Sequence, residues 1–127
     1  MAWPKSEIKT AKENAYLYES PDGVSRVYEI EGQNPYIIDT PVKRLICAYK
    51  ILTDIAPWDR EWDKSKAGFS RCSHAAKGLL SDFSLPEAIK CLTEVKTYHE
   101  VKGLSWTLET VAKKAMDWKY GRLNGTN

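Results

Sequence analysis

The sequence has no long hydrophobic run. Its first residues, MAWPKSEIKTAKEN, lack the apolar stretch of a signal peptide, and nothing approaches the roughly 18 consecutive apolar residues of a membrane-spanning helix. We therefore expect no membrane association and a cytoplasmic location.

Catalytic signatures are also missing: there is no G-x-S-x-G, no P-loop and no G-x-G-x-x-G. Asp59, Glu61 and Asp63 alternate in the segment WDREWD and could bind Mg²⁺ in a small nuclease or hydrolase. Arg60 and Lys64 interleave with them, which favours local ion pairs on a solvated turn. We expect the protein to have no enzymatic activity and to bind no cofactor. A Mg²⁺-dependent nuclease or hydrolase is the least favoured alternative.

Metal-binding residues are few. The chain has three cysteines and two histidines. Cys47, Cys72 and Cys91 are an odd number set among apolar helical positions, which indicates buried free thiols rather than a disulfide framework. Cys72 and His74 form a single close pair, whereas zinc sites usually combine two such pairs. We expect no metal site, and we place His99 near the C-terminal end of a helix.

The length of 127 residues fits one domain with a sizeable core. Net charge is only +2, but it is uneven. Residues 1–40 carry four Lys or Arg against seven Asp or Glu, and residues 41–80 carry eight against four. A basic middle follows an acidic arm, so a nucleic-acid-binding surface is compatible with the charge but not required by it.

Residues 1–40 form the predicted N-terminal arm. A short helix is expected before Tyr16, because Ile8, Ala11 and Ala15 share a helical stripe. Two runs rich in aromatic and β-branched residues, 16–19 and 24–30, flank the turn sequence SPDG and predict a β-hairpin. Residues 36–38 would add a third strand.

Residues 41–122 form the predicted helical domain. Thr40 and Pro41 open the first helix, whose apolar repeat continues to Ile55, before Pro57. Further helices are expected at 69–83, from the S-L-P-E capping box at residue 84 to before Gly103, and from Ser105 or Thr107 to Gly121. Residues 123–127 are expected to fray.

The segment between the first two helices is a candidate partner-binding surface. Trp58 and Trp62 are four residues apart and would share a face of one helical turn, with Arg60 between them. Packing of both tryptophans onto the core is the alternative.

Basic residues off the apolar stripes could together track a phosphate backbone. Aromatic side chains nearby would favour single strands. The candidates are Lys43, Arg44, Lys64, Lys66, Arg71, Lys77, Lys113, Lys114 and Arg122.

Several motifs in residues 69–120 follow a familiar order: AAKGLL at 75–80, S-x-x-EAIKC at 84–91, WTLETVA at 106–112 and DWK at 117–119. This order resembles the carboxy-terminal helical segment of phage and plasmid replication proteins, including replisome-organiser and DnaD-like proteins. The resemblance implies a DNA-associated, non-enzymatic module that acts near an origin or helps to load a helicase. Two departures from that family are expected: residues 1–68 do not predict a winged-helix domain, and the amino-terminal arm is short and acidic.

We therefore predict a mainly α fold, a bundle of about four helices with a small N-terminal β-hairpin. The expected function is that of a phage or mobile-element accessory protein, related to replication, that binds DNA and a protein partner such as a replication or host factor. The hairpin edge would also allow homo-oligomers. The alternative is a pure protein-interaction module, an adaptor or inhibitor that does not bind nucleic acid.

Overall fold

The computed structural model describes residues 15–30, 32–66 and 68–122. The helix predicted before Tyr16 and the tail at 123–127 lie outside these residues. Three antiparallel strands come first: β1 (Ala15–Glu19), β2 (Arg26–Ile30) and β3 (Tyr36–Ile38), in the order β1-β2-β3. The predicted hairpin and third strand are confirmed. At the first turn, Gly23 has a φ of +72°, a conformation that favours glycine.

The two faces of the sheet differ. Tyr28 and Ile38 point inward and are buried with Cys47 and Trp58. On the opposite face the strand register sets Tyr18, Val27 and Ile37 in one row across the three strands. Tyr18 and Ile37 are each 55% exposed. Within the described structure, the sheet therefore packs one face on the core and leaves apolar side chains, together with Glu29, exposed on the other.

Helix α2 (Pro41–Leu52) starts as predicted. The Thr40 hydroxyl accepts a hydrogen bond from the Lys43 amide at 3.2 Å, and Pro41 occupies the first turn. The helix ends earlier than its apolar repeat indicates, because the chain turns at Asp54, whose φ is +59°. Ile55 is buried all the same, beyond the end of the helix.

Four more helices follow: α3 (Arg60–Lys64), α4 (Phe69–Asp82), α5 (Leu85–Val101) and α6 (Leu108–Lys119). Ser84 and Glu87 form the predicted capping box of α5, and Thr107 rather than Ser105 caps α6. In the last turn of α5, the ring of His99 is buried and its Nδ1 donates to the Val95 carbonyl at 3.0 Å.

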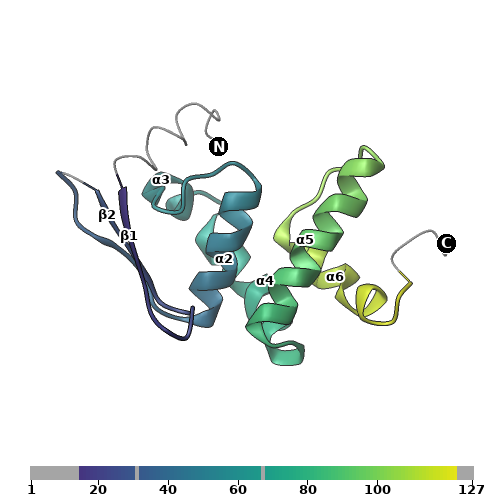
Figure 1. Ribbon diagram of the computed structural model, residues 1–127. Coiled ribbons are helices and arrows are strands. Elements are labelled where there is room, and N and C mark those ends of the chain that lie inside the picture. The colour runs from purple at the N-terminus through teal and green to yellow at the C-terminus, as the bar shows by residue number, and fades with distance from the viewer. Residues whose placement is uncertain (1–14, 31, 67, 123–127) are drawn as a thin grey trace.

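Helix α2 lies between the sheet and the other long helices (Figure 1). One side contacts α4 and α5, where Leu45, Leu92 and Val111 belong to the main core, and the other side contacts β3. The mainly helical architecture with a small N-terminal sheet is confirmed, and α3 adds a short helix to the four that were predicted. Cys47, Cys72 and Cys91 are buried thiols that form no disulfide within the described structure, as expected. Among the described residues, no helix combines the length and apolar character needed to cross a bilayer.

Candidate functional site

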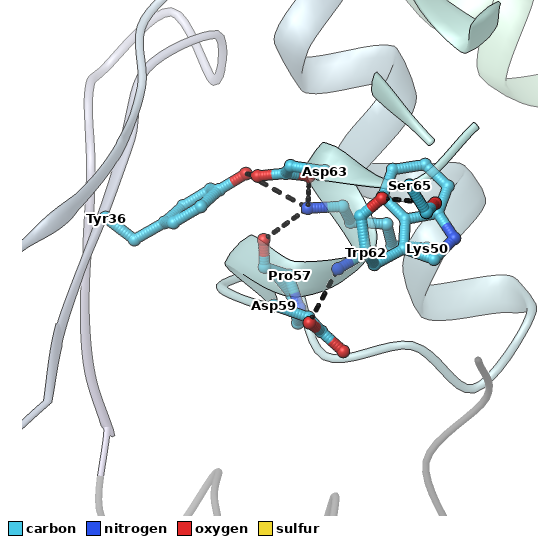
Figure 2. A network of polar contacts seen from close by, with 7 residues as sticks. All are labelled: Tyr36, Lys50, Pro57, Asp59, Trp62, Asp63 and Ser65. Carbon is cyan, nitrogen blue, oxygen red and sulfur yellow. Dashed lines mark hydrogen bonds and ion pairs between the residues drawn. The ribbon is translucent and has the colours of Figure 1, made fainter. Parts of the chain in front are cut away.

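A buried lysine ties α2 to β3 and α3 (Figure 2). Lys50 is 1% exposed. Its ammonium group lies 2.5 Å from Asp63 Oδ1 and donates to the Tyr36 hydroxyl at 3.0 Å and to the Pro57 carbonyl at 2.9 Å. The Tyr36 hydroxyl in turn donates to Asp63 Oδ2 at 2.5 Å. Three acceptors therefore match the three N–H bonds of one ammonium group.

Burial disfavours the charged forms of both Lys50 and Tyr36. Burial lowers the pKa of Lys50 below its ordinary value of 10.5, and the Asp63 carboxylate acts in the opposite direction. Burial, with the hydrogen bond to Asp63, raises the pKa of Tyr36 well above 10. Tyr36 therefore stays a donor at neutral pH.

The contacts among Lys50, Asp63, Tyr36 and the Pro57 carbonyl have a structural role. A lysine that acts as a nucleophile needs a free amine lone pair, whereas the Lys50 nitrogen is surrounded by three acceptors and lies 5.0 Å from the centre of the Trp62 ring. Asp59 caps α3 by accepting from the Trp62 amide at 3.0 Å. These contacts fix the position of α3.

The WDREWD segment differs from its sequence prediction in two ways. Asp63 pairs with Lys50 of α2 rather than with a local Arg or Lys, because it points inward. The tryptophans do not share a face: Trp58 packs on Tyr28 with ring centres 5.1 Å apart, and Trp62 packs near Tyr49 at 6.4 Å.

Burial of the tryptophans argues against a partner-binding role for them. Trp58 and Trp62 are each 6% exposed, so little of either ring could contact another molecule. Arg60 is half-buried and remains accessible. Within the described residues, no three His, Cys, Asp or Glu side chains are arranged to hold a metal ion.

A cavity of about 280 Å³ opens between β3, α2 and α3. The charged side chains that line it are Lys43, Lys50, Arg60 and Asp63. Arg60 is held by the backbone: its Nη2 donates to the carbonyls of Asn34 at 2.9 Å and Pro35 at 3.1 Å. The sequence places Lys43 and Arg60 in separate candidate surfaces, and the fold brings them to one cavity.

The clearest basic surface runs along the end of α3 and the outer side of α4. From Lys64 to Ser81 the sequence has no Asp or Glu. Lys64, Lys66, Arg71 and Lys77 are all exposed in this stretch. Arg71 pairs with Glu109, while the other three form no ion pair with any described residue. This acid-free stretch, residues 64–81, is hereafter the α4 basic face.

Helix α6 runs beside α4 in the same direction. Arg71 and Glu109 meet near the start of both helices, and Phe83 packs on Trp118 near their ends, with ring centres 5.8 Å apart. Lys113 is one turn after Glu109 and is exposed, so helical periodicity puts it on the side of α6 that borders the α4 basic face.

The other predicted nucleic-acid-binding residues are less available to a phosphate backbone. Lys43 pairs with Asp39 at 2.9 Å and Arg122 with Asp117 at 3.3 Å. Lys114 is half-buried. Arg44 is also half-buried, with Nε and Nη1 enclosed and without a hydrogen-bond partner in the described structure. With Arg71, which pairs with Glu109, five of the nine predicted residues thus differ from free surface cations.

Sequence reasoning missed Tyr36 and Lys50 as site residues. Lys50 reads as a solvent-facing residue because it lies off the apolar stripe of α2. The acidic and aromatic WDREWD segment follows α2 closely in the sequence, and this proximity could have indicated a partner for Lys50. His74 was considered only as a metal ligand, and it is exposed on the α4 basic face.

Comparison with known protein families, curated proteins and solved structures finds no match. The function must therefore be argued from the geometry of the chain itself.

Proposed function

We propose that this protein is a DNA-associated accessory protein without catalytic activity, which binds the phosphate backbone through the α4 basic face. The observation that carries the proposal is the exposure of Lys64, Lys66, Arg71 and Lys77 on a stretch with no carboxylate of its own. DNA affinity depends on such clustered cations, because each phosphate contact releases condensed counterions. The setting in phage or plasmid replication follows from the sequence resemblance of residues 69–120.

Binding to labelled single- and double-stranded oligonucleotides at low salt tests the proposal. The charge-reversal pair Lys66→Glu and Lys77→Glu should weaken binding by more than about tenfold, since two favourable charges become repulsive. Lys90→Glu with Lys102→Glu is the matched control, because it changes net charge equally on exposed positions of α5 and the turn after it. Equal losses in both pairs would mean that binding follows net charge and not this face.

A second candidate is a protein-interaction module. It is supported by the open sheet face, where Tyr18 and Ile37 are exposed beside Val27, and by β1, an edge strand that could pair with another chain. The same experiment separates the two candidates. Absence of DNA binding at low salt favours the interaction module, and binding that falls steeply with salt favours the accessory protein.

A further inference from the structure

We propose that the cavity between β3, α2 and α3 binds a phosphate group through Arg60 and Lys43. The inference concerns a discrete pocket, separate from the diffuse α4 basic face. The phosphate could belong to a DNA strand, in which case the inference rests on the proposed function, or to a free phosphorylated small molecule.

The cavity carries positive charge. Lys43, Lys50 and Arg60 line it together with a single carboxylate, Asp63. Asp63 is already neutralised by Lys50 at 2.5 Å, and that lysine has no N–H left for a ligand. No described carboxylate pairs with Arg60, whose guanidinium contacts backbone carbonyls instead.

Arg60 is oriented before any ligand arrives. Two carbonyls hold Nη2, and the guanidinium carbon lies 5.4 Å from the centre of the Tyr36 ring. Nε and Nη1 form no hydrogen bond with the described residues, so each can donate a single charge-assisted hydrogen bond to a phosphate oxygen. Both two-donor edges of the guanidinium include Nη2, which the two carbonyls already occupy. A donor fixed in advance loses less entropy on binding.

Lys43 supplies the second cation from the first turn of α2, where the positive end of the helix dipole adds to its charge. Its exposed pair with Asp39 is easily exchanged, because such pairs contribute little free energy in water. A phosphate bound by Lys43 would replace Asp39 as the partner of this ammonium group.

The remaining walls set the size and polarity of the ligand. Ile38 and Ile46 provide apolar surface, and Phe69 adds an aromatic side chain at the start of α4. A volume of about 280 Å³ lies just under the range of roughly 300–1,000 Å³ for small-molecule sites. The cavity therefore has room for a phosphate and at most one small ring, so the rest of a nucleotide would extend outside it.

An amide-detected NMR titration of the full chain tests the inference, with inorganic phosphate, thymidine 5′-monophosphate and thymidine as probes. The two phosphate compounds should shift the amide resonances of residues 36, 43 and 60 until the site is saturated, and thymidine should not.

Two variants test the residues. Arg60→Gln should weaken phosphate binding at least about tenfold and Lys43→Gln about fivefold, because charge-assisted hydrogen bonds are lost. Lys43→Gln is the variant least expected to misfold, since Lys43 is partly exposed and, among the described residues, its side chain pairs with Asp39 alone. Unchanged affinity in Lys43→Gln and Arg60→Gln, or shifts equally strong around Lys90, would overturn the inference.

Comparison of 5′-phosphorylated and 5′-hydroxyl oligonucleotides identifies the source of the phosphate. A preference for the phosphorylated strand that disappears in Lys43→Gln supports a DNA end as the ligand. Saturable binding of the mononucleotide without such a preference supports a free small molecule. Failure of the proposed function would instead appear as equal DNA affinity of wild type and the Lys66→Glu, Lys77→Glu pair, whatever the cavity binds.

Discussion

At the scale of single residues, Lys50 has the largest expected effect on the fold. A buried ammonium group is tolerated only when its charge and its hydrogen bonds are matched. Asp63, Tyr36 and the Pro57 carbonyl do this from three different segments of the chain. The same contacts explain why an acidic turn lies against α2 rather than in solvent.

Lys50→Met should lower the free energy of unfolding by about 3 kcal/mol, at the low end for a buried ion pair, because the half-buried Asp63 carboxylate loses its counter-ion but keeps the Tyr36 hydroxyl as a donor. Adding Asp63→Asn should recover part of this loss, since no unpaired charge then remains. Urea denaturation of the single and double variants measures both effects. If the double variant is no more stable than Lys50→Met, the ion pair is not what the substitution disturbs.

At the scale of elements, local signals in the sequence predicted the helices well. Thr40 with Pro41, Ser84 with Glu87, and Thr107 each satisfy amide groups of their own helix, so their effect is visible without tertiary structure. The end of α2 was predicted too late, because the apolar repeat continues through Ile55 while the backbone turns at Asp54.

The candidate sites depend on contacts that are distant in sequence, and these were predicted less well. The pairing of Lys50 with Asp63 and the meeting of Lys43 and Arg60 at one cavity require the packing of α3 on α2. The separation of Trp58 and Trp62 into two parts of the core has the same origin. The periodicity of one element carries no information about such contacts.

Two glycine substitutions test the path of the chain from α3 to α4. A Cβ on Gly68 would lie 2.0 Å from the Trp62 carbonyl oxygen, a backbone atom, whereas a Cβ on Gly78 of α4 would meet nothing within 4 Å. Gly68→Ala should therefore destabilise the protein by about 1–3 kcal/mol. Gly78→Ala should stabilise it by about 0.5–1 kcal/mol, because alanine favours an exposed helix interior. Thermal denaturation measures both, and changes of the same sign would contradict the described turn.

At the scale of the whole molecule, the buried thiols should make the free energy of unfolding fall as the pH becomes alkaline. Burial raises the pKa of Cys72 and Cys91 from 9.0 to about 11. The unfolded chain loses these protons near pH 9, while the folded chain keeps them. Their contribution to stability is therefore complete below pH 9 and is lost as pH rises towards 11.

We accordingly expect the free energy of unfolding to fall between pH 9 and 11, and to fall less steeply in Cys91→Ala. The comparison uses the slope against pH, so the cavity left by the substitution does not affect it. Denaturant titrations across this range measure the slope. Identical slopes in the variant and the wild type would show that the Cys91 thiol does not contribute.

The charge distribution of the whole molecule carries the functional claim, and the salt dependence of DNA binding tests it most directly. Neutralising Lys66 and Lys77 with glutamine should reduce the slope of log K against log salt concentration by about 2, since each phosphate contact contributes roughly 0.9. Lys90→Gln with Lys102→Gln should leave the slope unchanged. A slope that the first pair does not alter, or that both pairs alter equally, would contradict DNA binding through the α4 basic face.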